Sequence, residues 1–176
     1  MALLVATALG AGLIPKAPGT CGTLMAVPLA VLLAHLGPLW LWAGALVVSV
    51  VGTWAAGVYC RATGKEDNQQ IVIDEVAGYL VTMLLVPATA LNLALGFGLF
   101  RLFDIWKPGP VRILDRRVHG GFGVMADDLA AGVLGALTLL VLHRLGAPLL
   151  QDLHRAHAFP AWLAQGLTVA SSGSHA

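Results

Sequence analysis

The stretch RLFDIWKPGPVRILDRRVHGGFGVMADD, residues 101–128, concentrates the ionic side chains of an otherwise strongly apolar chain. It holds five of the ten Lys and Arg residues and four of the nine acids, namely Arg101, Lys107, Arg112, Arg116, Arg117, Asp104, Asp115, Asp127 and Asp128. Apolar segments flank it on both sides. Because charge is costly at membrane depth and is usually kept there for a function, the stretch predicts a site at the membrane interface that handles a charged group.

The composition of the whole chain supports a membrane location. Its 176 residues are 58% hydrophobic and 11% charged, and the mean hydropathy is +0.83. Soluble domains carry about a quarter charged residues, so we expect an integral membrane protein with a single domain over residues 1–176. The net charge of +1 argues against a nucleic-acid binder. Two cysteines are too few for a disulfide framework or a zinc site.

The first half of the chain predicts short helices, a loop and one full span. Residues 3–13 are apolar but cover about half of the roughly 20 residues that a span requires, so we expect a short packed helix. No basic residue precedes them, which argues against a secretory signal. Residues 14–23 predict a loop, because two prolines and two glycines exclude continuous helix. Residues 24–36 and 39–59 predict a helical hairpin, and the polar residues 61–70 must face solvent.

The middle of the chain allows two interpretations. Residues 76–86 and 88–103 are apolar and separated by a proline, so they form either one kinked span or a pair of short helices. The pair is favoured, because a chain that crosses and returns brings Asp74 and Glu75 to the same membrane face as residues 101–128.

The second half ends in a predicted span over residues 129–145. Asp127 and Asp128 would open this helix, where acids suit the N-terminal dipole, and two glycines within it allow close helix packing. The excess of basic residues between 101 and 117 places that loop in the cytoplasm. Residues 146–176 predict a peripheral tail, an interfacial helix followed by disorder.

Asp74 and Glu75 stand directly before an apolar helix rather than in the polar loop available at residues 61–70. They either cap the helix in water or serve a site, and their position favours the site. Since neighbouring residues on a helix point about 100° apart, at most one of them is expected to aim at a shared centre.

The residues Arg101, Asp104 and Lys107 share one face of a helix that ends at Pro108. They form either an ion-pair ladder or part of a pocket, because a glycine-rich turn at 119–123 could fold the next acids back toward Asp104. Clustered carboxylates repel one another unless a cation is present, and oxygen ligands favour Mg²⁺ over zinc. The candidate catalytic and metal-ligating residues are Asp74, Glu75, Asp104, Asp127 and Asp128.

The basic residues have two possible roles, which are anchoring to anionic headgroups or binding a substrate phosphate. Thr20 and Thr23 stand beside backbone N–H groups before a helix, an arrangement that suits phosphate but also an ordinary turn. His119 either shuttles a proton or is simply solvated. The candidate substrate-binding residues are Lys16, Thr20, Arg101, Lys107, Arg112, Arg116 and His119.

Three blocks in this order carry a resemblance to a known family: PKAPGTCGTL at 15–24, IVIDEVAGY at 71–79, and RLFDIWKPGPVRILDRRVHGGFGVMADDLAAG at 101–132. The chain resembles the phosphatidylglycerophosphatase A family of bacterial membrane lipid phosphatases up to about His143. The N-terminus looks shorter and less basic than is usual in that family. The resemblance implies an all-α polytopic membrane bundle of about six helices around a central one.

The resemblance also implies the reaction, which is Mg²⁺-dependent hydrolysis of the terminal phosphate monoester of phosphatidylglycerophosphate to phosphatidylglycerol and phosphate. The site would face the cytoplasm in the bacterial inner membrane. A metal-activated water would attack in line, while Arg101, Lys107 and Arg112 neutralise the phosphoryl oxygens. An aspartyl-phosphate formed on Asp104 or Asp127 is the rival mechanism.

The partner implied is therefore a membrane phospholipid, with no nucleic acid and no protein partner. A transporter subunit is an alternative that predicts acids near the middle of spans. A structural subunit with a headgroup-anchoring loop is another, and it predicts that Asp74, Asp104 and Asp127 tolerate replacement by Asn.

Overall fold

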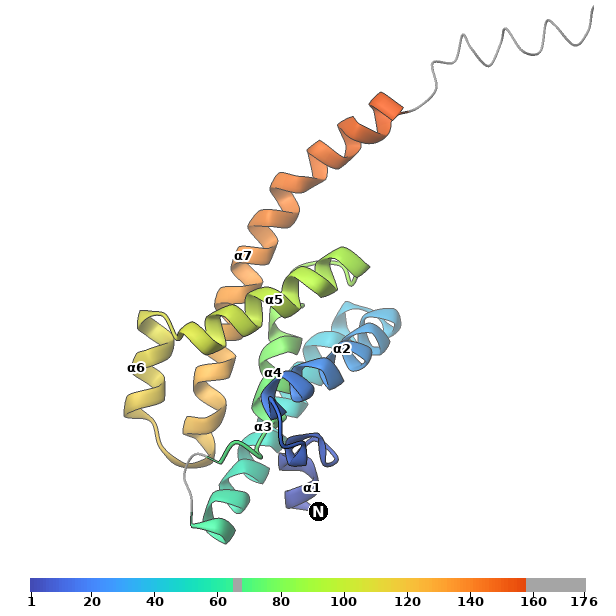
Figure 1. Ribbon diagram of the computed structural model, residues 1–176. Helices are drawn as coiled ribbons and strands as arrows, with labels where there is room; N and C mark the ends of the chain where they lie inside the picture. Colours follow the sequence, from blue (N-terminus) through green and yellow to red (C-terminus); the bar gives the residue numbers. More distant parts are fainter. Residues whose placement is uncertain (65–67, 158–176) are drawn as a thin grey trace, which may run out of the picture. The chain divides into compact units, whose positions relative to one another are not determined.

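The fold is all-helical in the part of the chain that the computed structural model describes, residues 1–64 and 68–157, with backbone alone at 110, 115–117 and 147–157 (Figure 1). The elements are α1 (Ala2–Ala6), a 3-10 helix (Ala11–Leu13), α2 (Pro18–Leu36), α3 (Pro38–Thr63), α4 (Ile73–Thr82), α5 (Ala90–Trp106), α6 (Gly109–Arg117) and α7 (Gly120–His157). The chain divides into two units, Met1–Val141 and Leu142–Ala176. All the helix packing described below lies within the first unit.

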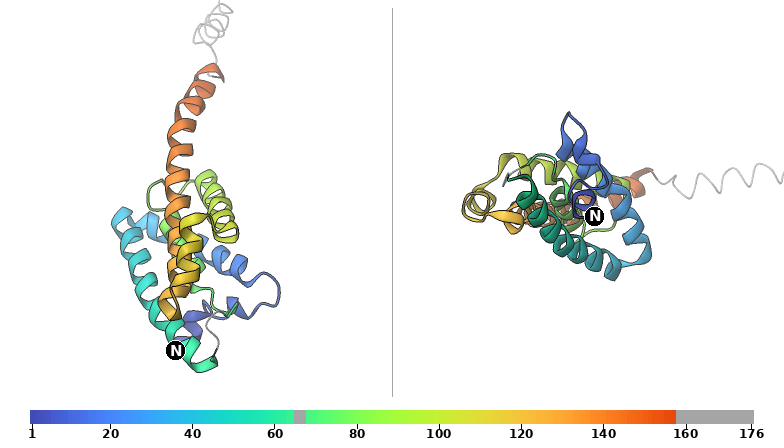
Figure 2. Two further views of the ribbon diagram at one scale, coloured as in Figure 1. Left: turned by 90° about the vertical axis from the view of Figure 1, so that its left-hand side faces the viewer. Right: turned by 90° about the horizontal axis from the view of Figure 1, so that it is seen from below.

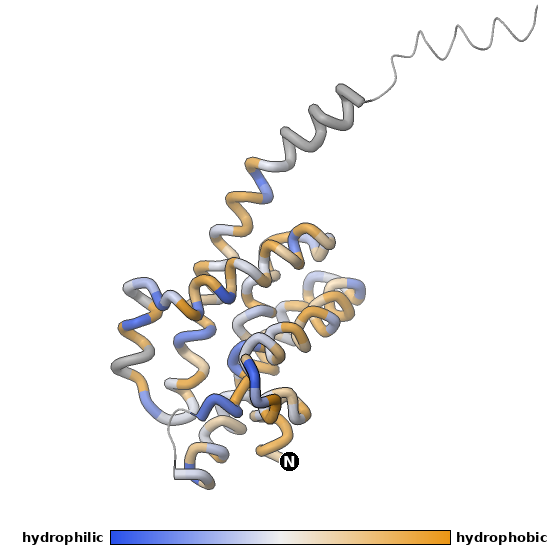
Figure 3. Tube along the Cα trace, in the orientation of Figure 1, coloured by the Kyte–Doolittle hydropathy of each residue, from blue (hydrophilic) through white to orange (hydrophobic). Residues whose placement is uncertain are grey.

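Within the described residues, three helices are long and apolar enough to cross a membrane, namely α2, α3 and the part of α7 from Gly120 to Gly146. Figure 3 shows hydrophobic residues dominating α2 and α3, whereas hydrophilic residues gather at the end of α5, on α6 and before α4. The predicted hairpin is confirmed, because α2 and α3 are separated only by Gly37, whose φ of 123° suits glycine. These helices fit the membrane protein expected from the composition.

The N-terminal segment differs from the expected helix over residues 3–13. After α1 the backbone enters the left-handed region at Ala8, Leu9 and Gly10, so the chain turns before the 3-10 helix. Thr7 stabilises this turn, because its hydroxyl donates to the Leu3 carbonyl at 2.9 Å and accepts from the Gly10 N–H at 3.2 Å. The turn was not predicted because residues 3–13 are almost entirely apolar.

The expected loop over residues 14–23 is also shorter than predicted. α2 already begins at Pro18, and a proline in the first turn of a helix is well tolerated because its missing N–H would have had no helical partner. Thr20 and Thr23 therefore lie within the first turns of α2, and the Thr23 hydroxyl donates to the Gly19 carbonyl at 2.9 Å.

The favoured pair of short helices in the middle of the chain is confirmed. α4 ends at Thr82 and α5 begins at Ala90, with a turn between them. Asn92 fixes this turn, because its side-chain amide donates to the Pro87 carbonyl at 2.8 Å and its N–H to the Thr89 hydroxyl at 3.2 Å.

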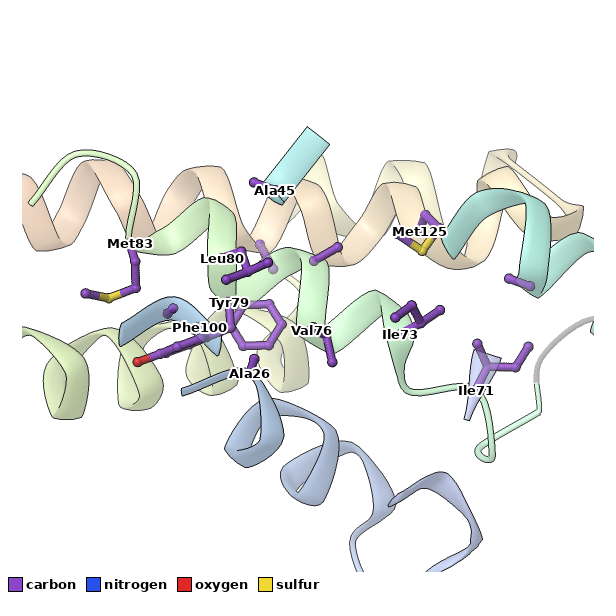
Figure 4. Packing of buried hydrophobic residues seen from close by; sticks show 14 of the residues in the cluster. Ala26, Ala45, Ile71, Ile73, Val76, Tyr79, Leu80, Met83, Phe100 and Met125 are labelled. Atoms are coloured by element: carbon purple, nitrogen blue, oxygen red, sulfur yellow. The ribbon is translucent and has the colours of Figure 1, made fainter. Parts of the chain in front are cut away.

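α4 occupies the centre of the first unit and packs against α2, α3, α5 and α7. Figure 4 shows its buried side chains Val76, Tyr79 and Leu80 between the neighbouring helices. Gly132 of α7 packs directly against the Gly78 carbonyl, as the glycines of the last span predicted. An arrangement of six helices around α4 is not confirmed.

α7 corrects the prediction for the last span. It begins at Gly120 rather than near residue 127, so Asp127 and Asp128 lie in its third turn and not at its start. The glycine-rich segment is helical because Gly121 packs against the α3 backbone at Thr53 and Gly57, where a side chain would not fit. α6 lies beside these first turns of α7 (Figure 2). The helix continues to His157, and the disorder predicted for the tail lies outside the described residues.

Candidate active site

A polar cavity of about 390 Å³ opens in the first unit where α2, α4, α5 and α7 meet. Seven of its lining residues are charged, and all seven are among those predicted from the sequence. They are Asp74, Glu75, Arg101, Asp104, Lys107, Asp127 and Asp128. Five carboxyl groups and two basic groups give an excess of three negative charges when all are ionised.

The first turn of α4 contributes Asp74 and Glu75, whose carboxyl groups both reach the cavity. One oxygen of each lies within 4.8 Å of the other and of an Asp128 carboxylate oxygen from α7. The expectation that only one of the two acids would reach a shared centre is therefore wrong. The two residues point in directions about 100° apart, but their side chains are long enough for one oxygen of each to reach the same point. The Asp74 Oδ1 also accepts the Glu75 N–H at 3.1 Å.

The last two turns of α5 contribute Arg101 and Asp104. The Arg101 Nη1 lies 2.6 Å from the Asp104 Oδ2 and 3.8 Å from the Glu75 Oε1. Of the two alternatives for this helical face, the pocket is the one observed: Arg101 and Asp104 pair along α5 and line the cavity, whereas Lys107 pairs with Asp127 of α7. Arg101 is largely buried, so it holds two acids from different helices in a setting with little water.

Lys107 ends α5 and links it to α7. Its backbone has a φ of 47°, a left-handed conformation that is uncommon for a residue with a side chain. The side-chain Nζ lies 2.7 Å from the Asp127 Oδ2. This conformation ends the helix before Pro108 and directs the ammonium group into the cavity.

Burial determines the protonation behaviour of the α4 acids. It raises the pKa of Asp74 well above its usual range, and the nearby charges of Glu75 and Asp128 raise it further. Burial also raises the pKa of Glu75, where the Asp104 charge adds to the effect and the Arg101 guanidinium opposes it. The two acids are therefore poorly compensated by protein groups alone.

The donor set fits a divalent cation that prefers oxygen. The Glu75 Oε2 and Asp128 Oδ2 are buried and accept no hydrogen bond from any described residue. Buried oxygens of this kind normally have a partner, and carboxylates without Cys or His donors are ligands that suit Mg²⁺. Among the residues that the structure describes, Asp74, Glu75 and Asp128 lie close enough together to hold one ion.

Other predicted residues do not line this cavity. Lys16, Thr20, Arg112 and His119 are absent from its wall, and the side chain of Arg116 lies outside the described part. The 14–23 segment does reach the site, but through Pro15, Ala17, Pro18 and Gly19.

Asn68 and Gln69, which line the cavity before α4, were not predicted as site residues. They were assigned to the solvent-facing loop at 61–70. Their position just ahead of the two acids is the signal that could have identified them, because α4 begins only a few residues later.

Comparison with known proteins agrees with this arrangement. The family model for phosphatidylglycerophosphatase A matches residues 4–143. The chain is 41% identical over 139 residues to a phosphatidylglycerophosphatase A of Escherichia coli, covering 76% of this chain and 78% of the relative. It is 34% identical over 145 residues to that of Haemophilus influenzae, covering 79% and 86%.

A third relative carries a different name. A putative phosphatidylinositol-3-phosphatase of Bacteroides thetaiotaomicron is 37% identical over 147 residues, covering 79% of this chain and 91% of the relative. No solved structure matches at a significant level. With a family model that matches most of its length, the chain belongs to the phosphatidylglycerophosphatase A family, whose members are phosphoric monoester hydrolases.

Proposed function

We propose that this protein is a Mg²⁺-dependent phosphatase that hydrolyses the terminal phosphate monoester of phosphatidylglycerophosphate, releasing phosphatidylglycerol and phosphate. The observation that carries the proposal is the meeting of three close carboxylates, from Asp74, Glu75 and Asp128, with two basic groups in one polar cavity. A phosphate dianion needs both kinds of group, because the carboxylates hold a cation and the basic side chains neutralise the phosphoryl oxygens.

Asp74, Glu75 and Asp128 are the proposed metal ligands. When bound, Mg²⁺ supplies charge neutralisation at the phosphate oxygens and lowers the pKa of a bound water. The excess of negative charge and the unpartnered oxygens of Glu75 and Asp128 support this choice.

Arg101 and Lys107 are the proposed phosphate-binding groups. Each is held in the cavity by an ion pair, Arg101 by Asp104 at 2.6 Å and Lys107 by Asp127 at 2.7 Å. A side chain that is already oriented loses less rotamer freedom when it binds substrate. Asp104 and Asp127 would thus position the basic groups. Because each of these two carboxylates is already paired with a cation, it is a weaker nucleophile, which favours attack by water over formation of an aspartyl-phosphate.

Only the headgroup of the lipid would enter the cavity. A volume of about 390 Å³ with a largely charged wall suits a glycerophosphate and excludes acyl chains, which would stay in the bilayer. The adjoining α6 exposes both Arg112 and Ile113, as an element at a membrane interface does. The site would face the cytoplasm of the inner membrane, where basic residues are enriched.

The test is phosphate release by the purified protein in detergent micelles. Phosphatidylglycerophosphate should be hydrolysed with Mg²⁺, and EDTA should abolish release until Mg²⁺ is restored. Phosphatidylinositol 3-phosphate should be compared at equal surface concentration, because a relative is named for that activity. Faster release from the inositol lipid would overturn the substrate proposed here, and metal-independent release would overturn the metal site.

A further inference from the structure

The cavity wall includes uncharged polar residues that the proposed chemistry does not use. Besides the seven charged residues, the polar side chains of the lining residues are the uncharged amides of Asn68 and Gln69, in the segment before α4. Phosphate binding needs charge, whereas the rest of a glycerophosphate headgroup presents an uncharged hydroxyl. Neutral amides are suited to that group, since they donate and accept hydrogen bonds without competing for a cation.

Tyr59 of α3 fixes this segment in place. Its buried hydroxyl donates to the Gln70 Oε1 at 2.5 Å and accepts from the Asn68 Nδ2 at 3.5 Å. The turn is closed internally as well, because the Gln70 N–H donates to the Asn68 Oδ1 at 3.2 Å and the Ile71 N–H to the Asn68 carbonyl at 2.8 Å. The side chains of Asn68 and Gln70 are thus occupied in shaping the turn.

The other end of the segment is held by the N-terminal elements. The Val72 N–H donates to the Ala6 carbonyl at 2.9 Å, and Gly12 packs so closely against the Gln70 carbonyl that no side chain would fit there. The turn is therefore connected to α3 at one end and to α1 at the other. The backbone that carries Gln69 is thus held in place on both sides.

Gln69 is the residue left to act on a ligand. It lines the cavity, it is exposed, and its amide makes no hydrogen bond to any described residue. The side chains of Asn68 and Gln70, on either side, are already engaged in hydrogen bonds within the turn and to Tyr59.

We propose that Gln69 recognises the free hydroxyl of the headgroup glycerol and that Tyr59, through Gln70 and Asn68, positions it. This inference rests on the proposed function and adds to it a source of headgroup selectivity. Gln69 is a specificity residue, since it would touch substrate away from the phosphorus, and Tyr59 is a positioning residue.

The experiment compares phosphatidylglycerophosphate with its 2-deoxy analogue, in which the central hydroxyl of the headgroup glycerol is replaced by hydrogen. We expect the wild type to favour the natural lipid by about 3- to 10-fold in kcat/KM, the range of one neutral hydrogen bond. Gln69→Leu, which keeps the side-chain size, should bring this ratio close to one, mainly by raising KM for the natural lipid. Tyr59→Phe should lower the ratio in the same direction.

Tyr79→Phe is the matched control. Tyr79 is also buried and also donates one hydrogen bond, to the Leu93 carbonyl at 3.1 Å, but it does not line the cavity. Its loss should change thermal stability without changing the ratio of the two lipids.

The outcomes separate this inference from the proposed function. If the wild type hydrolyses both lipids equally, or if Gln69→Leu keeps the wild-type ratio, the role of Gln69 is overturned while the phosphatase assignment stands. An equal change of the ratio in Tyr59→Phe and Tyr79→Phe would overturn the positioning role. If the wild type releases phosphate from neither lipid, the proposed function itself fails, and this inference fails with it.

Discussion

The Nζ of Lys107 lies 2.7 Å from the Oδ2 of Asp127, so an ion pair joins the end of α5 to the third turn of α7 across 20 positions of sequence. The two residues come from opposite halves of the stretch, residues 101–128, that concentrates charge in the sequence. Between them lie α6 and the start of α7, which carry the chain out of the site and back. Both residues line the cavity, so their pairing joins two parts of its wall.

Replacing Lys107 by Gln should therefore weaken substrate binding and loosen the cavity wall. The variant removes one phosphate donor and leaves the Asp127 carboxylate buried near other acids. We expect kcat/KM to fall by about 10- to 100-fold, since hydrogen bonds to charged groups contribute about 1.5–3 kcal/mol. Arg61→Gln, at the exposed end of α3 and outside the cavity, is the control and should keep wild-type kinetics. Equal losses in both variants would contradict a specific role for Lys107.

Arg101 should be sensitive even to a conservative change. Its guanidinium lies beside the carboxylates of both Asp104 and Glu75, and the compact ammonium group of a lysine cannot reproduce the planar arrangement of several N–H donors. We expect Arg101→Lys to lower kcat/KM by about tenfold or more while the helical content measured by circular dichroism is retained. Wild-type kinetics in this variant would show that positive charge alone is sufficient there.

The contact between α4 and α7 predicts a stability difference between two glycines. A Cβ at Gly132 would collide with the Gly78 carbonyl, whereas a Cβ at Gly98 of α5 would meet nothing within 4 Å. Gly132→Ala should lower the thermal midpoint, with a cost of about 1–3 kcal/mol as for other overpacked sites. Gly98→Ala should leave it unchanged or raise it, because alanine is the better helix former. A Gly132→Ala variant as stable as Gly98→Ala would contradict the close packing.

The raised pKa values of Asp74 and Glu75 predict how stability depends on pH when metal is absent. A carboxyl group whose pKa is higher in the folded state contributes stability below its unfolded pKa, and this contribution is lost as the pH rises through the folded pKa. In EDTA we expect the thermal midpoint to decrease as the pH is raised from about 5 to about 8, and to decrease less in Asp74→Asn.

Mg²⁺ should act in the opposite direction in the same measurement. Because a cation binds the ionised carboxylates, it should raise the midpoint more at about pH 8 than at about pH 5. A midpoint that rises with pH in EDTA and does not respond to Mg²⁺ would argue that these acids are already compensated by protein groups.

Much of the site could be predicted because its chemistry is local in sequence. Asp74 and Glu75 adjoin an apolar helix, and Arg101, Asp104 and Lys107 share a helical face, so both groups could be identified as candidates from the sequence. The pairing of two short helices followed from requiring these groups to meet. The resemblance to a known family pointed to the same residues.

The parts that could not be predicted depend on contacts between distant segments. Glycine-rich sequence normally indicates a turn, yet residues from Gly120 onward are helical because Gly121 must lie against α3. The role of Gln69 depends on Tyr59, which holds the turn before α4 from a different helix. Neither Gly121 nor Gln69 has a local pattern that reveals its partner.

The most direct test of the central claim is phosphate release from phosphatidylglycerophosphate by Asp128→Asn beside wild type, in Mg²⁺ and in EDTA. Asp128 belongs to the close trio of carboxylates, and Asn keeps its shape while removing its charge. We predict Mg²⁺-dependent release by wild type and a loss of at least about 100-fold in kcat for the variant, with its thermal midpoint in EDTA no lower than that of wild type. Release by a folded Asp128→Asn protein at the wild-type rate, or by wild type at the same rate in EDTA, would contradict a carboxylate-held metal at this site.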